Sequence, residues 1–215
     1  MSRRSPDNHS SGAGGETAEA PRFVLASASP RRRELLHQAG YDFHLHPADI
    51  DEDDHPQKLL PGDLAEWLAT QKAEVISARF PASAVLGADT IVAFGDAILG
   101  KPHDADHARQ MLRLLGGSTH LVVTGIAVRR RRDDFKRSAR VMSAVKMREL
   151  TDEEIERYVA TLDWQGKAGG YGIQDNDPFV TRITGSFTNI VGLPMDETAA
   201  MLAEAGVIAT LLVSS

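Results

Sequence analysis

Residues 23–36, FVLASASPRRRELL, form the stretch around which the rest of the chain is organised. The apolar, β-prone residues Phe23–Leu25 predict a strand, and the small residues that follow break the run. An amphipathic segment over residues 31–40 then predicts a helix. Ser29 is suited to cap it, because its hydroxyl can accept from a backbone N–H, and Pro30 is suited to the first helical position. The stretch therefore predicts a strand, a tight loop and a helix.

Three arginines occupy the first turn of this predicted helix, where acidic residues are normally favoured. A helix N-terminus carries partial positive charge, so Arg31, Arg32 and Arg33 add charge of the same sign. A bound polyanion would compensate, because backbone N–H groups, guanidinium groups and the hydroxyls of Ser27 and Ser29 converge at this point. A solvated basic turn is the alternative, but the small-residue loop and the capping residues favour a phosphate site.

The composition is that of an ordinary globular protein of 215 residues, 42% hydrophobic and 25% charged. We expect a disordered tail over residues 1–20, which are rich in Ser, Gly and charge, and a single domain over residues 21–215. The absence of cysteine excludes disulfides, thiolate metal sites and thiol nucleophiles. No apolar run reaches the length of a membrane span and the N-terminus lacks a signal-peptide core, so we expect a cytoplasmic protein.

The formal net charge of −6 argues against broad binding of nucleic acid, which requires a basic face. It does not exclude a nucleotide, because a small phosphate ligand needs only local cations. The run RRRR at residues 129–132 suggests an RNA-binding module as one alternative. However, Asp133 and Asp134 follow the run, and an exposed loop over residues 129–137 is favoured.

Strand and helix patterns alternate along the chain and predict a mixed α/β fold, with antiparallel pairs in the second half. Asp63, Asp104 and the capping box of Thr151 and Glu154 mark three helix starts. His103 and His107 are four residues apart, but no third ligand is near in sequence, and we interpret them as surface residues. The predicted strands cover residues 41–50, 85–92, 119–128, 140–147, 179–183 and 187–191, with a hairpin over residues 94–101. The predicted helices cover residues 63–79, 104–116, 152–161 and 194–206.

Asp89 stands within an apolar strand pattern, VLGADTIV. An unpaired ionised carboxylate is expensive to bury, so such a residue is functional, paired or bound to a metal, although a turn cap at the strand end is the alternative. The predicted hairpin that follows returns Lys101 toward this strand. Lys72, on the less apolar side of its predicted helix, is either a surface lysine or a second phosphate cation, and the sequence leaves both readings open.

Two further segments carry residues typical of ligand binding. The acidic loop 51–54 is either solvated or places one carboxylate, Glu52, where it helps hold a divalent cation against a triphosphate. The glycines of residues 164–177, WQGKAGGYGIQDND, permit close backbone approach to a ligand beside Lys167 and Gln174, and a flexible loop is the alternative.

Together these features predict a nucleoside triphosphate site, with cations for phosphates, a carboxylate for metal or base chemistry and an amide for a neutral ring. The Walker lysine motif is absent, which argues against a P-loop enzyme. The chain also resembles the Maf family of nucleoside triphosphate pyrophosphatases in several separated blocks that occur in the family's order. The blocks are residues 27–32 (SASPRR), 87–90 (GADT), 101–102 (KP), 167–169 (KAG) with 172–174 (GIQ), and 185–186 (GS) with 191–194 (VGLP).

This resemblance implies a mixed twisted β-sheet flanked by helices, of the ITPase/Maf type, with a substrate cleft between two lobes. It implies hydrolysis of the triphosphate to nucleoside monophosphate and pyrophosphate with Mg²⁺, Mn²⁺ or Co²⁺. Asp89 would activate water, with Glu52 and Asp89 at the metal, and the implied catalytic group is Asp89, Glu52, Lys72 and Lys101. The implied substrate-binding residues are Ser27, Ser29, Arg31, Arg32, Thr90 and Gln174.

Arg31, Thr90 and Gln174 match the specificity positions of the branch that resembles dTTP and UTP pyrophosphatases. A carboxamide at Gln174 can both donate and accept, and so complements the carbonyl and imide N–H of uracil or thymine. We therefore expect a pyrimidine nucleotide house-cleaning enzyme, with a homodimer as a possible assembly. The alternative is a nucleotide-binding regulator of cell division and septum formation that needs no catalysis. The choice among dTTP, UTP and modified pyrimidine nucleotides stays open.

Overall fold

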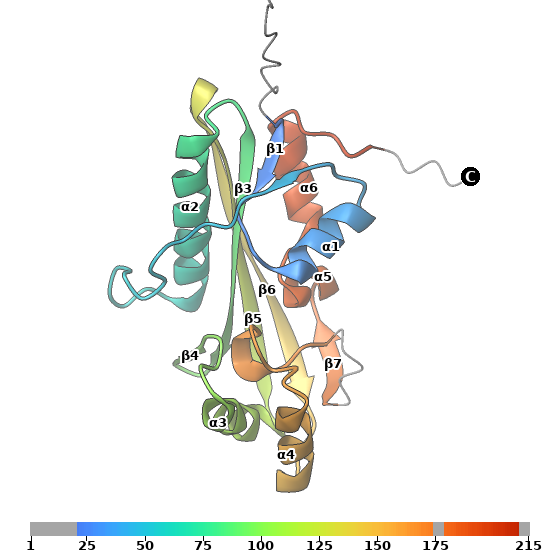
Figure 1. Cartoon of the computed structure of the whole chain (residues 1–215). Helices are drawn as coiled ribbons and strands as arrows, with labels where there is room; N and C mark the ends of the chain where they lie inside the picture. Colours follow the sequence, from blue (N-terminus) through green and yellow to red (C-terminus); the bar gives the residue numbers. More distant parts are fainter. Residues whose placement is uncertain (1–20, 174–178, 211–215) are drawn as a thin grey trace, which may run out of the picture.

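The computed structural model describes residues 21–173 and 179–210, in which a seven-stranded sheet is flanked by helices (Figure 1). This arrangement confirms the mixed α/β class, whereas the predicted tail over residues 1–20 lies outside the described residues. The strands are β1 (Phe23–Leu25), β2 (His44–Leu45), β3 (Ala84–Phe94), β4 (Ala97–Leu99), β5 (Thr119–Arg130), β6 (Phe135–Met147) and β7 (Val180–Thr184). The helices are α1 (Pro30–Gln38), α2 (Pro61–Arg79), α3 (Ala105–Leu115), α4 (Asp152–Ala160), α5 (Phe187–Val191) and α6 (Met195–Glu204), with short 3-10 turns η1 (Arg131–Asp133) and η2 (Ala168–Gly170).

The sheet has the strand order β2-β1-β3-β5-β6-β7, and β4 pairs with β3. β1 pairs in parallel with both β2 and β3, because α1 and α2 provide the crossover connections. All pairs from β3 to β7 are antiparallel. β3, β5 and β6 contain 11, 12 and 13 residues, so three long strands form the centre of the sheet.

Local sequence signals explain two helix starts. In α1, the hydroxyl of Ser29 accepts from the backbone N–H of Arg32, and Pro30 occupies the first turn, as predicted. In α4, Thr151 and Glu154 form the predicted capping box, in which each side chain accepts from the other residue's backbone N–H.

Asp104 caps α3 as predicted, but the predicted cap of α2 is wrong. That helix already begins at Pro61, because proline fixes a helical φ and needs no N–H partner in the first turn. Asp63 therefore lies within the first turn, where it forms an ion pair with Arg140 of β6.

Residues 187–191 form helix α5, so the strand predicted there is wrong. The β-prone letters FTNIV favoured a strand, but the hydroxyl of Ser186 accepts from the backbone N–H of Asn189 and starts a helical turn. Gly192, with a φ of 121°, ends it. The strand predicted over residues 41–50 is also mostly wrong, since only the two residues of β2 pair with a neighbour.

The loop predicted over residues 129–137 is wrong in extent, because β5 continues to Arg130 and β6 begins at Phe135. Arg129 is buried, and its Nε donates to Oε1 of Glu74 at 2.9 Å. Part of the four-arginine run is therefore buried in strand β5 and joined to helix α2, and is not an exposed basic surface.

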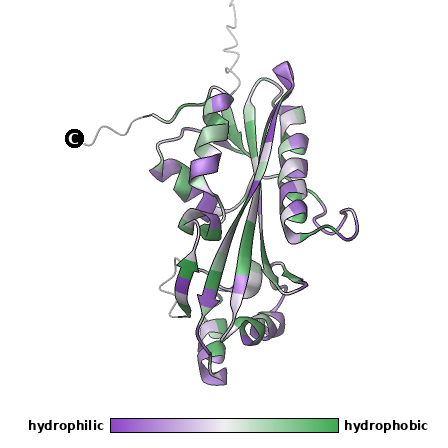
Figure 2. Ribbon diagram, turned by 180° about the vertical axis from the view of Figure 1, so that it is seen from behind, coloured by the Kyte–Doolittle hydropathy of each residue, from purple (hydrophilic) through white to green (hydrophobic). Residues whose placement is uncertain are grey.

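Helices cover both faces of the upper part of the sheet, with α2 on one face and α1, α5 and α6 on the other (Figure 1). In Figure 2 hydrophobic residues follow the long strands, and the helices alternate hydrophobic and hydrophilic surfaces. The approach of α2 is close: a Cβ added at Gly87 or Gly125 would lie about 2 Å from its backbone, at 2.1 and 2.2 Å respectively. Glycine at these positions therefore permits the helix to pack onto β3 and β5.

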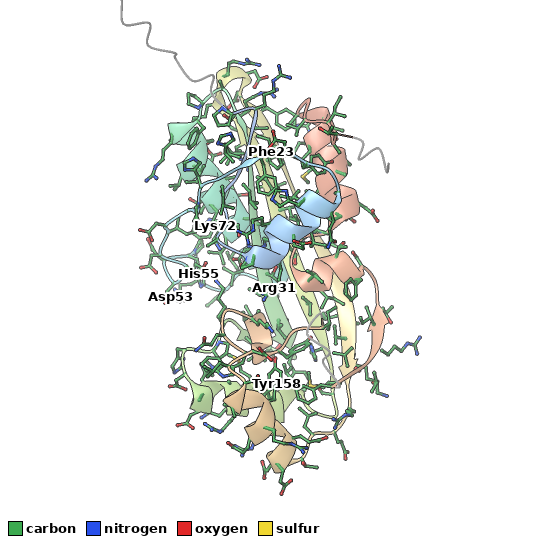
Figure 3. The ribbon with its side chains drawn as sticks, turned by 45° about the vertical axis from the view of Figure 1, so that its right-hand side comes forward. Phe23, Arg31, Asp53, His55, Lys72 and Tyr158 are labelled. Atoms are coloured by element: carbon green, nitrogen blue, oxygen red, sulfur yellow. The ribbon has the colours of Figure 1, made fainter. Side chains whose placement is uncertain are left out.

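Separate hydrophobic clusters define two lobes. The upper lobe contains β1, α1, α2 and α6, and its core includes Leu86 of β3. The lower lobe contains β4, α3, α4 and β7, and its core includes Val92 of the same strand. In Figure 3, Phe23 lies in the upper lobe, Tyr158 in the lower lobe, and Lys72 between them.

One edge of β3 lacks a strand partner where the lobes meet. β1 pairs with residues 84–86 of β3 and β4 pairs with residues 92–94, so residues 87–91 face no neighbouring strand on this edge among the described residues. Asp89 and Thr90 lie within this gap, which places both at the boundary between the lobes.

Candidate active site

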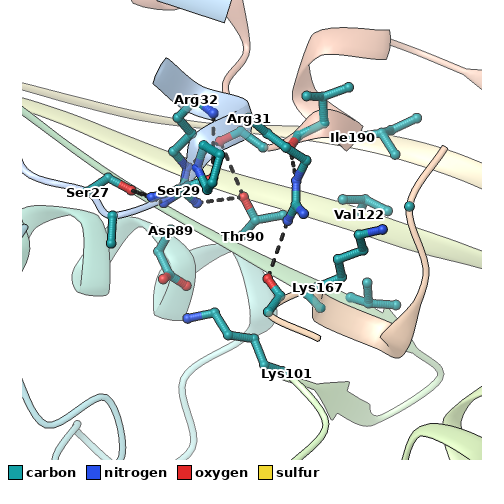
Figure 4. A pocket seen from close by; sticks show the side chains of 18 of the residues that line it. Ser27, Ser29, Arg31, Arg32, Asp89, Thr90, Lys101, Val122, Lys167 and Ile190 are labelled. Carbon is teal, nitrogen blue, oxygen red and sulfur yellow. Dashed lines mark hydrogen bonds between the residues drawn. The ribbon is translucent and has the colours of Figure 1, made fainter. Parts of the chain in front are cut away.

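A cavity of about 450 Å³ opens at the unpaired edge of β3. Its walls come from the loop after β1, the start of α1, the helix α2, the strand β3, the segment around η2 and the end of α5 (Figure 4). Cationic side chains outnumber carboxylates along the wall, which suits a polyanionic ligand. The charged lining residues are Arg31, Arg32, Lys72, Lys101, Lys167, Glu52 and Asp89.

The two carboxylates meet on one buried lysine. Nζ of Lys72 lies 2.5 Å from Oδ1 of Asp89 and 2.7 Å from Oε1 of Glu52, and Nζ of Lys101 lies 3.4 Å from Oε2 of Glu52. Lys72 and Asp89 are only 7% and 5% exposed. The surface-lysine reading of Lys72 is therefore wrong, and its ammonium group neutralises a carboxylate that would be costly to bury alone.

The electrostatics of Glu52 follow from this cluster. Burial raises the pKa of its carboxyl group, but the hydrogen bond and charge of Lys72, together with the charge of Lys101, outweigh burial and give a net lowered pKa. Glu52 is therefore an anion at neutral pH and an available oxygen ligand.

Arg32 organises the opposite wall through three hydrogen bonds. Its Nε donates to the carbonyl of Gly192 at 2.8 Å, and its two terminal nitrogens donate to Oγ of Ser27 and Oγ1 of Thr90, each at 3.0 Å (Figure 4). Burial lowers the pKa of Arg32, and the charge of Asp89 partly opposes that effect. The guanidinium group thus ties α1, β3 and the end of α5 together beside the cavity.

Arg31 connects two segments of the cavity wall. Its Nε donates to the carbonyl of Val191 and its Nη2 to the carbonyl of Gly166, both at 3.4 Å (Figure 4). These acceptors belong to α5 and to the glycine-rich segment, so one side chain links two separate parts of the cavity wall.

The structure brings together nine of the ten site residues that the sequence predicts, and the tenth, Gln174, lies outside the described residues. Lys167, which the sequence analysis named beside the glycine-rich segment but not among the implied site residues, adds a further cation to the cavity. Thr124 and Asn189, both fully buried, were also missed. The only sequence signal for Thr124 is one hydroxyl within the apolar run VVTGIAV. The nine residues that line the cavity are Ser27, Ser29, Arg31, Arg32, Glu52, Lys72, Asp89, Thr90 and Lys101.

The donor set fits a hard divalent cation that binds together with a phosphate ligand. Within residues 21–173 and 179–210, no group of three or more His, Asp or Glu residues could hold a metal. Glu52 and Asp89 nevertheless lie side by side on Lys72, and Mg²⁺ is commonly held by one or two carboxylates plus substrate phosphates and water. A metal at this position would thus depend on the substrate for its remaining ligands.

Comparison with known proteins places these features in a family. The profile described as "Maf-like protein" matches residues 22–205, which include every charged residue of the cavity. The chain belongs to the Maf family. The sequence resemblance noted from the separated blocks is therefore confirmed. None of the helices of this Maf protein that the structure describes is long and apolar enough to cross a membrane.

Several curated Maf relatives are similar over most of their length. The "dTTP/UTP pyrophosphatase" of Cereibacter sphaeroides is 50% identical over 188 residues, which cover 86% of this chain and 95% of the relative. The proteins of the same name from Ruegeria sp. and Pyrococcus furiosus are 47% and 43% identical, covering 86% and 81% of this chain and 94% and 90% of the relatives.

Proposed function

We propose that this Maf protein hydrolyses dTTP, UTP and modified pyrimidine nucleoside triphosphates to nucleoside monophosphate and pyrophosphate, and so cleanses the nucleotide pool. One observation carries the proposal: the buried carboxylate of Asp89, held by Lys72 at 2.5 Å, lines a cavity rich in cations. The names of the relatives support the substrate class. A protein that only bound nucleotide would have no need of a carboxylate placed at such electrostatic cost.

In the proposed reaction, Asp89 orients a water molecule and accepts its proton as the water oxygen attacks the α-phosphorus. The bond from this phosphorus to the bridging oxygen breaks, and pyrophosphate leaves with that oxygen. A divalent cation held by Glu52 and Asp89 would supply charge neutralisation at the phosphates. Lys101 and Arg31, which line the cavity, would stabilise the charge of the leaving pyrophosphate.

The remaining residues position the substrate. Backbone N–H groups at the start of α1, next to Ser27 and Ser29, are suited to phosphate oxygens. Lys72 keeps Asp89 and Glu52 in one orientation by binding both carboxylates. Gln174, outside the described residues, is proposed from its chemistry to read the pyrimidine carbonyl and imide N–H.

The test is product analysis with purified protein, Mg²⁺ and a panel of dTTP, UTP, CTP, GTP and 7-methyl-GTP. We expect monophosphate and pyrophosphate from dTTP and UTP. Asp89→Asn should lower kcat by about 10²- to 10⁴-fold, the usual range for a general base. The matched control is Asp96→Asn, the same change at an exposed turn residue after the same strand, which should keep full activity.

Two results would contradict the proposal. Release of inorganic phosphate with nucleoside diphosphate would place the cleavage at a different bond. Nucleotide binding without turnover of any triphosphate would favour the regulatory alternative instead.

A further inference from the structure

A chain of hydrogen bonds leads from the cavity wall into the interior. Nη2 of Arg32 lies 3.0 Å from Oγ1 of Thr90, which lies 3.0 Å from Oγ1 of Thr124, which lies 3.0 Å from the backbone carbonyl of Asn189. The chain crosses from α1 through β3 and β5 to α5. Thr90 lines the cavity, whereas Thr124 is fully buried and is not among the lining residues.

The ends of this chain fix the direction of every hydrogen bond in it. A guanidinium group can only donate, so Thr90 accepts from Arg32. A carbonyl oxygen can only accept, so Thr124 donates its single hydroxyl hydrogen to Asn189. The hydrogen of Thr90 is therefore directed to Oγ1 of Thr124 at 3.0 Å, with the carbonyl of Gly192 as a longer second acceptor at 3.4 Å.

We propose that Thr124 is a positioning residue for substrate selection, because it makes Thr90 a hydrogen-bond acceptor toward the cavity. Once the hydroxyl hydrogen of Thr90 points inward and Arg32 uses one lone pair, the oxygen can offer a ligand only its other lone pair. The ligand group that meets Thr90 must then be an N–H or an O–H.

This inference rests on the proposed function and deepens it. Two groups of a uridine or thymidine nucleotide are such donors: the imide N3–H of the base and a sugar hydroxyl. Cytosine has no hydrogen on N3, so the first source would make Thr90 select against cytidine nucleotides. Without the hydrogen bond to Thr124, the hydroxyl of Thr90 could rotate and donate to a ligand as well as accept from it. Thr90 would then no longer favour ligands with an N–H or O–H donor.

Thr124→Val tests the proposal, because it keeps the side-chain shape and removes the nearer acceptor of the Thr90 hydroxyl, leaving only the Gly192 carbonyl at 3.4 Å. Thr124→Ser is the matched control, because it retains the hydroxyl. Both are assayed with UTP, CTP and 3′-deoxy-UTP. If the base is read, the preference of the wild type for UTP over CTP should fall about fivefold in the valine variant, the size expected for one hydrogen bond of about 1 kcal/mol. If the sugar is read, the preference for UTP over 3′-deoxy-UTP should fall instead.

In either arm the loss should arise mainly in KM, and the serine variant should restore the preference to within about twofold. A merely structural role would lower the activity on all three nucleotides by one factor, and that result would overturn the proposal. Unchanged ratios in the valine variant would overturn it as well.

A second substitution keeps the test decisive if burial of a methyl group at Thr124 prevents folding. Thr90→Val, at the half-buried cavity wall, should lose the same preference by itself. Where Thr124→Val does fold, adding it to Thr90→Val should cause no further loss. Full selectivity in Thr90→Val would overturn the proposal. The two proposals can fail separately. Turnover by the wild type tests the proposed hydrolysis, whereas calorimetric binding of non-hydrolysable UTP and CTP analogues measures the preference between the two bases without catalysis.

Discussion

His120 makes stability sensitive to mild acid. Its ring is 2% exposed within the core of the lower lobe, and Nε2 lies 2.6 Å from the hydroxyl of Tyr171. The other ring nitrogen, Nδ1, has no hydrogen-bond partner among the described residues. Burial lowers the pKa of His120 from 6.5 to about 4, because a charged ring would be stripped of water there.

The sign and size of the effect follow from this shift. Between pH 6.5 and about 4 the unfolded chain binds a proton at His120 that the folded protein does not, so stability falls as the pH drops through this window. The complete loss is about 3 kcal/mol, from about 1.4 kcal/mol per pKa unit. About 2 kcal/mol of it should be lost between pH 7.5 and pH 5.

Urea unfolding at both pH values measures this loss. His120→Gln removes the titrating group but keeps a side-chain nitrogen near the Tyr171 hydroxyl. Between pH 7.5 and pH 5 the variant should therefore lose about 2 kcal/mol less stability than the wild type. The matched control, His44→Gln, makes the same change at an exposed site and should keep the wild-type loss. Equal pH-dependent losses in wild type and His120→Gln would refute the reasoning.

Three further predictions concern packing, a buried charge and the metal. Gly125→Ala should lower the free energy of unfolding by about 3 kcal/mol, because its Cβ would lie 2.2 Å from the backbone of α2. The control Gly100→Ala, whose Cβ would meet no atom within 4 Å, should leave stability nearly unchanged. Urea unfolding measures both variants. Arg129→Met should cost about 2–4 kcal/mol in the same assay, because it removes the buried guanidinium that donates to Glu74 and to two backbone carbonyls. The exposed Arg132→Met should cost less than about 0.5 kcal/mol. Chelation by EDTA should abolish pyrophosphate release and added Mg²⁺ should restore it; full turnover after exhaustive chelation would contradict a metal requirement.

Much of the candidate site could be predicted because its residues conflict with their local context. Asp89 in an apolar strand and arginines at a helix N-terminus each need a compensating partner, and the structure brings them to one cavity. Thr124 could not be found in this way, because a threonine in a strand is ordinary and its partners are distant in sequence. The burial of Lys72 was equally hidden in the local pattern, since a lysine on a helix gives no sign of its burial, and only the family resemblance included it in the site.

The fold was predictable where capping residues coincide with hydrophobic periodicity, as at Ser29 and Thr151. It was not predictable over residues 187–191, where intrinsic preference for a strand is overridden by the Ser186 cap and by packing on β5 and β6. The extent of the turn near Arg131 also depended on pairing between strands, which no local pattern encodes.

The three long strands that run through both lobes connect the lobes of the enzyme rigidly and oppose a hinge motion between them. β3, β5 and β6 are paired along almost their entire length, so moving one lobe against the other would require breaking or twisting many backbone hydrogen bonds at once. The width of the cleft is therefore set before any nucleotide arrives. A ligand that fits the cleft binds with little free-energy cost for rearranging the protein. A ligand that is too large would have to separate the lobes, and the paired strands oppose that movement.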